Sequence, residues 1–370
     1  MSTPRALSDR ELNRALLARQ LLLKRAAITP AAAIEKLAGL QAQFSPAPYI
    51  GLWSRLTKFA IADLEQAIAS RSVVKATLMR GTLHLVTAKD YPALSVATTQ
   101  SRGDRWAPEA RRLTDARKIY QAALRYAKTP RTRVELAEFL KTQGVADDLA
   151  TPMLWWLIAS QGWLVHVPPS GSWGHHRAGD LVAADSWIGA LRAPELGSAV
   201  RLMVERHLSA FGPATVDDIS SWSSIRTPPI RAALDELGPK IRTFTDQRGR
   251  TLYDLKGAPL PDPETVAPVR FLPKWDSSLL AYAAPERVRI LAEAQRKTVI
   301  GKNGDVAQTI LVDGVVAGTW AVLSKTGVAT LTVTPFKKLA KADATALVDE
   351  GERLARFVAP AAKAHRVAFA

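Results

Sequence analysis

Apolar residues in the first part of the chain recur every three to four positions, which is the period of an amphipathic α-helix. Residues 7–26 show this spacing, and Ser8 followed by Glu11 is the pattern of a capping box at a helix start. We therefore predict helices over residues 7–26, 30–40, 47–56 and 62–70.

The period changes from that of a helix to that of a strand near residue 73. Residues 73–79 and 82–86 have the composition of strands, and the short segment Arg80-Gly81 between them predicts the turn of a β-hairpin. Helices followed by a two-stranded ribbon make up a winged helix. We predict one such unit over residues 1–112.

The order of helices and then a hairpin recurs twice, without a sequence repeat that can be aligned. A second unit, 113–192, is predicted from helices over 115–127, 133–142 and 151–161 and strands over 163–167 and 173–177. A third unit, 193–256, is predicted from helices over 198–210, 216–222 and 228–237 and strands over 241–245 and 251–255. The pattern thus favours three tandem winged helices.

Beyond residue 256 the pattern is that of a separate module. Four prolines between residues 257 and 268 indicate a linker, and Asp313-Gly314 is a hairpin signal. Strands are predicted over 298–300, 309–312, 315–322 and 329–333, with a closing helix over 341–358. We predict a small β-barrel with a terminal helix over residues 257–370 and an α+β fold for the whole chain.

The charge balance favours a polyanionic partner, because 50 lysines and arginines stand against 34 aspartates and glutamates, a net charge of +16. There is no cysteine, which excludes disulfides and thiolate metal sites. No apolar run approaches the roughly 20 residues that span a bilayer. The sequence has no long heptad repeat of the kind that predicts a coiled coil. We expect a cytoplasmic, nucleoid-associated monomer that binds double-stranded DNA.

Basic residues are concentrated between residues 101 and 133. This window holds ten lysines and arginines, among them Arg111 and Arg112, and three acidic residues. Such a run is commonly a solvated helix face. Because it lies beside predicted helix-turn-helix elements, we interpret it as a DNA contact, which predicts binding that weakens as salt rises.

Five short blocks resemble, in order, the signatures of one known family. They are 37–46 (LAGLQAQFSP), 80–86 (RGTLHLV), 211–215 (FGPAT, followed by Asp218 and Trp222), 271–276 (FLPKWD), and 312–314 with 318–320 (VDG and GTW). Together they resemble the AlkZ/YcaQ family of bacterial DNA glycosylases. The glutamines of the first block resemble the Gln-x-Gln motif of the AlkZ branch, whereas the other branch has an acidic residue where Gln43 stands.

The resemblance implies tandem winged helices, a C-terminal β-barrel and a monofunctional glycosylase. Known members remove bulky or cross-linking alkyl adducts from DNA purines, which in the AlkZ branch protects some producers of a DNA-alkylating natural product. The resemblance also implies that Gln41 and Gln43 are catalytic.

An amide pair suits this chemistry. An N7-alkylated guanine is a cation and already a good leaving group, so the enzyme must supply a positioned water and partial negative charge near the sugar. Gln41 and Gln43 would lie on one side of an extended segment but would splay apart in a helix. The catalytic interpretation therefore requires non-helical backbone; the alternative is a helix end with two solvated glutamines.

Other residues are candidates for contact with DNA or support of the site. Alternation places Thr82 and His84 on one face of the first hairpin, where His84 either contacts the site or, half-buried, holds the backbone. Asp276 is either a second catalytic carboxylate or fixes a turn or pairs with an arginine. The remaining candidates are Arg80, Trp275, the wing residues Arg248 and Arg250, and His166, His175 and His176 as phosphate contacts.

We expect hydrolysis of the N-glycosidic bond of N7- or N3-alkylated purines in duplex DNA. No phosphate-loop or dinucleotide motif is present, and no carboxylate cluster accompanies His175-His176, so no nucleotide, metal or other cofactor is expected. The alternative is a non-catalytic winged-helix DNA binder, such as a regulator. A scaffold for protein partners is disfavoured by the basic charge. Base flipping and excision in place are both compatible with the sequence.

Overall fold

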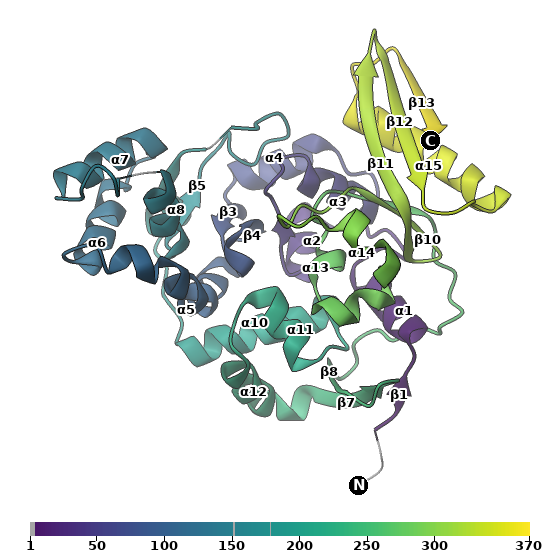
Figure 1. The fold of residues 1–370 in the computed structure, drawn as a ribbon, viewed down its shortest axis with the longest axis horizontal. Helices are drawn as coiled ribbons and strands as arrows, with labels where there is room; N and C mark the ends of the chain where they lie inside the picture. Colours follow the sequence, from purple (N-terminus) through teal and green to yellow (C-terminus); the bar gives the residue numbers. More distant parts are fainter. Residues whose placement is uncertain (1–3, 151, 178) are drawn as a thin grey trace.

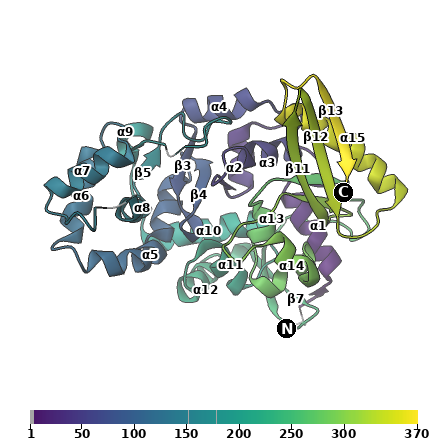
Figure 2. The same cartoon turned by 45° about the horizontal axis from the view of Figure 1, so that its top comes forward.

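The computed structural model describes residues 4–150, 152–177 and 179–370 and has an α+β fold (Figure 1). Within this part of the chain the strands form two five-stranded sheets and one three-stranded sheet. Figure 2 shows the helices α5–α8, within residues 91–160, at one end of the molecule and the strands β11–β13, within residues 315–369, at the other. None of the described helices is both long and apolar enough to cross a membrane.

The N-terminal part contains the predicted helices, some of them shorter than predicted. The capping box of Ser8 and Glu11 is present, but the first helix ends at Arg19 and Leu21 has a φ of +57°. The elements are β1 (Ala6–Leu7), α1 (Asp9–Arg19), α2 (Pro30–Lys36), β2 (Leu40–Gln41), α3 (Ala47–Arg55) and α4 (Ile61–Ala69).

The predicted first hairpin is confirmed. It consists of β3 (Val73–Thr77) and β4 (Leu83–Thr87), joined by the short 3-10 turn η1 (Met79–Gly81). β2 pairs with β4 on one side, and β5 (Leu164–His166) pairs with β3 on the other, giving the order β2-β4-β3-β5-β6.

The second predicted hairpin has the wrong return strand. The strand that pairs with β5 is β6 (Leu181–Ala183), not residues 173–177. The physical reason is that Trp173 packs edge-on against Tyr49 and Phe357, which holds that segment as a loop. Because β5 joins the first hairpin, the predicted units 1–112 and 113–192 share one sheet.

Helices of the second unit surround a separate apolar core at one end of the molecule. The twenty-residue helix α5, which the apolar pattern did not predict, leads into it and also packs against α10. The predicted helix 151–161 is seen from residue 152, since residue 151 lies outside the described residues. The elements are α5 (Tyr91–Ala110), α6 (Ala116–Tyr126), α7 (Arg133–Thr142), α8 (Pro152–Ser160) and α9 (Ala184–Ile188).

The third predicted set of helices and its hairpin are also observed. β7 and β8 pair antiparallel, and β1 from the N-terminus adds a parallel third strand to β7. The elements are α10 (Leu196–Phe211), α11 (Val216–Ser223), α12 (Thr227–Glu236), η2 (Gly238–Lys240), β7 (Ile241–Asp246) and β8 (Thr251–Leu255). The order of helices and hairpin agrees with tandem winged helices; that name and the four domain boundaries remain predictions.

The C-terminal module is an open sheet, and the predicted barrel is wrong. Among the described residues the sheet has the order β13-β12-β11-β10-β9, with β13 and β9 at its two edges and the terminal helix α15 packed against it. The predicted strand 298–300 is instead the end of α14. The elements are β9 (Arg270–Leu272), α13 (Ser277–Leu280), η3 (Ala284–Arg289), α14 (Glu293–Val299), β10 (Thr309–Val312), β11 (Val315–Lys325), β12 (Val328–Pro335), α15 (Lys341–Val358) and β13 (Ala364–Phe369).

Candidate active site

The Gln-x-Gln segment runs along the edge of the central sheet. α2 ends before Ala38, and Gly39 has a φ of +92°, at a point where a Cβ would meet Val86 Cγ1 at 3.0 Å. Glycine therefore allows the chain to turn and lie close to β4. Gln41 is then opposite His84, and Ala42 N donates to Leu83 O at 2.7 Å. The non-helical backbone that the catalytic interpretation requires is observed.

Gln41 is buried and its amide oxygen is held by an arginine. Arg80 Nη2 donates to Gln41 Oε1 at 2.8 Å, and Arg80 Nη1 donates to the backbone oxygen of Trp222 at 2.9 Å. Arg80 has a φ of +55° in the turn η1, which packs against α11. Burial, and secondarily the charge of Arg287, lower the pKa of Arg80 to about 10, so the guanidinium stays charged at neutral pH.

Gln43 differs from Gln41 because its side chain is exposed. Its Oε1 accepts a hydrogen bond from Leu83 N at 3.3 Å. Leu83 precedes His84 on β4, the residue opposite Gln41. This contact fixes the direction of the amide group while leaving it open to solvent. Gln43 is therefore the more accessible glutamine of the pair.

His84 is fully buried rather than half-buried, and it holds the hairpin backbone; a contact with the site remains a prediction. Its Nδ1–H donates to Thr82 O at 3.0 Å, and no described residue hydrogen-bonds its Nε2. Burial, and then the nearby charge of Arg80, lower the pKa of His84 to about 3. The Thr82 hydroxyl donates to Met79 O at 3.1 Å. Both side chains thus support the hairpin backbone, and His84 is neutral at physiological pH.

A sequence model described as DNA glycosylase AlkZ-like matches residues 34–357, which include both glutamines, Arg80 and His84. The chain belongs to the AlkZ-like DNA glycosylase family. A protein from Streptomyces sahachiroi named interstrand DNA cross-link repair glycosylase is 24% identical over 361 residues, covering 91% of this chain and 93% of that one. The solved structure of Streptomyces sahachiroi DNA glycosylase AlkZ has the same fold, with a TM-score of 0.79, 21% identity and 99% of each chain covered.

In this AlkZ-like chain a loop that the sequence did not associate with the motif lies beside it. Phe44 and His176 form a stacked ring pair with centroids 6.1 Å apart, and the Ser45 hydroxyl donates to the backbone oxygen of His175. His176 is exposed, whereas the interpretation of His166 as a phosphate contact is wrong because it is buried in the sheet with a pKa lowered to about 3. Sequence reasoning missed this loop because no local pattern links residues so distant along the chain.

Asp276 has structural partners. It caps α13 by accepting from Ser278 N at 3.0 Å, and Arg55 Nη2 donates to it at 2.9 Å in a fully buried ion pair. This is the turn-fixing, arginine-pairing alternative. Trp275 Nε1 donates to Gly304 O at 2.9 Å, and the amine of Lys274 lies over its ring. The structure gives neither residue a contact with Gln41 or Gln43.

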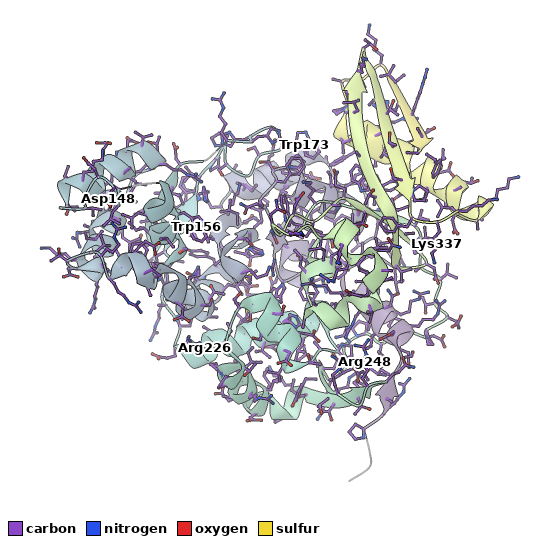
Figure 3. The ribbon with its side chains drawn as sticks, in the orientation of Figure 1. Asp148, Trp156, Trp173, Arg226, Arg248 and Lys337 are labelled. Carbon is purple, nitrogen blue, oxygen red and sulfur yellow. The ribbon has the colours of Figure 1, made fainter. Side chains whose placement is uncertain are left out.

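The remaining basic candidates lie in two separate places, one near the end of α5 and one on the β7–β8 turn. Arg111 is exposed at the end of α5, and Arg112 pairs with Asp148. In Figure 3, Asp148 lies at one end of the molecule and Arg248, on the β7–β8 turn, at the bottom. Arg248 N and Arg250 N both donate to Asp246, which shapes that turn.

The described ranges contain no group of three or more His, Asp and Glu side chains that could hold a metal ion. A small pocket of about 30 Å³ opens beside Arg80 and is lined by polar groups that include Ser101 and Ser224. A pocket of this size has room for about one water molecule beside Arg80, the residue that holds Gln41.

Proposed function

We propose that the chain is a monofunctional glycosylase that hydrolyses the N-glycosidic bond of N7- or N3-alkylated purines in duplex DNA. The observation that carries this proposal is the non-helical Gln-x-Gln segment at the sheet edge, with Gln43 exposed and its amide oxygen bonded to Leu83 N. Membership of the AlkZ-like family supports it. We further propose that it acts as a monomer at the nucleoid.

The proposed reaction needs little acid–base help. As the bond from C1′ to the cationic purine breaks, its electron pair neutralises the base and positive charge develops on the sugar. A water held by the glutamine pair adds its oxygen to C1′ and releases its proton to solvent, which leaves an abasic site. The amide dipole of Gln43 stabilises the sugar-centred charge, and neutral His84 adds no opposing charge.

We propose bulky or cross-linking adducts as substrates, because a relative covering nearly the whole chain is named for repair of interstrand cross-links. The net charge of +16 favours binding to the DNA backbone. In this account the exposed edge position of Gln43 lets the site act on a base that a cross-link prevents from leaving the helix.

The test is base release by the purified chain from duplex oligonucleotides that carry N7-methylguanine or a nitrogen-mustard cross-link. We expect free alkylated base and alkali-sensitive abasic sites from at least one of them, and none from undamaged duplex. The alternative, a non-catalytic DNA binder, predicts sequence-specific binding of undamaged duplex with no base released from either lesion, and that result would overturn the proposal.

A further inference from the structure

The two glutamines of the motif have the same side chain but different neighbours. Gln41 is 6% exposed and faces the guanidinium of Arg80, whereas Gln43 is exposed and faces a backbone amide. A primary amide carries both an acceptor and two donors, so its role depends on which of them its neighbours occupy.

Both neighbours can only donate, and this fixes which end of each amide they face. An arginine guanidinium and a backbone N–H have no acceptor, so the atoms that approach them must be the amide oxygens. The orientation of Gln41 and Gln43 therefore follows from the chemistry of their neighbours, even though the oxygen and nitrogen of an amide are nearly alike in shape.

At Gln41 the oxygen is occupied by a strong, charge-assisted bond of 2.8 Å. The cation draws electron density toward Oε1, which makes the Nε2 hydrogens better donors. The charge of Arg287 adds to the positive potential. Gln41 is thus suited to meet an electronegative atom and poorly suited to stabilise a cation.

At Gln43 the bond to the oxygen is 3.3 Å long and comes from a neutral amide. The oxygen keeps a lone pair that faces solvent beside β4. It can therefore accept a hydrogen bond from a water molecule and direct its dipole at developing positive charge.

We infer that the glutamines have separate roles, which rests on the proposed function. Gln41, oriented by Arg80, donates to an electronegative atom of the damaged nucleotide, and Gln43 accepts from the attacking water. Arg80 is then a positioning residue, held in place by its second bond to Trp222 O.

The first experiment uses glutamate, which has the shape of glutamine but only accepts. Single-turnover base release is measured for wild type, Gln41→Glu and Gln43→Glu. In Gln41→Glu the carboxylate pairs with Arg80 but both donors are removed, and we expect release to slow about a hundredfold. Gln43→Glu retains the acceptor and should slow release much less. Equal effects, or Gln41→Glu as fast as wild type, would overturn the inference.

The second experiment separates positioning from folding. We expect Arg80→Met to slow release about tenfold or more while the DNA dissociation constant is unchanged, and the double variant with Gln41→Glu to be no slower than Gln41→Glu alone. If the double variant instead slows release by the product of the two single effects, Arg80 does not act through Gln41, and its positioning role would be overturned.

Gln20 supplies the matched control, because its oxygen also faces an arginine, Arg55 at 3.4 Å, while its Nε2 donates to Ala210 O in the core. Gln20→Glu should lower the melting temperature but leave release by the folded protein unchanged. Absence of release by wild type would contradict the proposed function itself; these comparisons apply only where wild type is active.

Discussion

Three buried histidines make the stability of the chain sensitive to acid. Burial lowers the pKa values of His84 and His166 to about 3 and that of His207 to about 4. Above a pH of about 6.5 each is neutral in the folded and unfolded states alike. Below a pH of about 6.5 these histidines are protonated in the unfolded chain but stay neutral in the folded chain. The free energy of unfolding therefore falls as the pH drops toward the pKa values of the folded state.

His84→Asn tests this at one residue. Asparagine can still donate to Thr82 O but does not titrate. We expect the variant to be less stable than wild type at neutral pH. Between pH 6 and 4 its free energy of unfolding should fall less steeply than that of wild type, and the two slopes should differ by about 1.4 kcal/mol per pH unit. Denaturant titrations at several pH values measure the slope. An unchanged slope would mean that His84 titrates normally in the fold.

The buried ion pair between Arg55 and Asp276 should contribute strongly to the stability of the fold. Asp276→Ala leaves a buried guanidinium without its carboxylate and removes the cap of α13, so we expect a decrease of about 3–5 kcal/mol in the free energy of unfolding. Base release by the folded fraction should be preserved, with Asp276→Asn as the milder variant if Asp276→Ala does not fold. Loss of release by stable Asp276→Asn would restore a catalytic role.

At the scale of elements, the turn between β10 and β11 attaches the C-terminal module to α1. Asn13 donates to Gly314 O at 2.8 Å, and Arg14 donates to Asp313 O at 3.0 Å and pairs with its carboxylate. A Cβ on Gly314 would meet side chains of Leu17, Asn13 and Arg14 at 2.5–2.9 Å. A side chain at this position would therefore require these three buried side chains to shift.

Gly314→Ala should destabilise the protein by the strain of its φ of +81° and by this crowding, about 2–4 kcal/mol together. Gly304→Ala is the matched control, because Gly304 has a φ of +79° but no neighbour within 4 Å of a Cβ. Thermal unfolding of both variants isolates the contribution of packing against α1. Equal destabilisation would show that the turn does not depend on packing against that helix.

Helices and hairpins with a pattern in their own residues could be predicted from the sequence. Strands that form by pairing with a distant part of the chain could not. The hairpin β3–β4 follows from its turn and period, and the helices from their apolar spacing. β6 and β13 depend on partners elsewhere in the chain, and the open sheet follows from β13 pairing with β12 at one edge and not with β9. The catalytic interpretation required the non-helical backbone that is observed at Gln41–Gln43. The Arg80–Gln41 contact depends on the pairing of β2 with β4, which no local pattern predicts.

At the scale of the whole molecule, the excess positive charge should control DNA affinity. Arg111, Arg117 and Lys118 are exposed around the start of α6. Replacing all three with glutamine should weaken DNA binding and flatten its salt dependence. The log–log slope should change by up to about 0.9 for each phosphate that the variant no longer neutralises.

Lys337, Lys338 and Lys363 supply an equal-charge control on the C-terminal module, where Figure 3 marks Lys337 far from Asp148. Binding isotherms at several salt concentrations compare the two triple variants. If both bind DNA more weakly to the same degree, net charge rather than the α6 face determines binding.

In the proposed reaction the exposed Gln43, two residues after β2, takes part in base release. The most direct test of this role is single-turnover release of an alkylated purine by wild type and Gln43→Ala, with the DNA dissociation constant of each measured alongside. We expect Gln43→Ala to bind damaged duplex as tightly as wild type and to release base about a hundredfold more slowly. Release by Gln43→Ala at the wild-type rate would contradict the account.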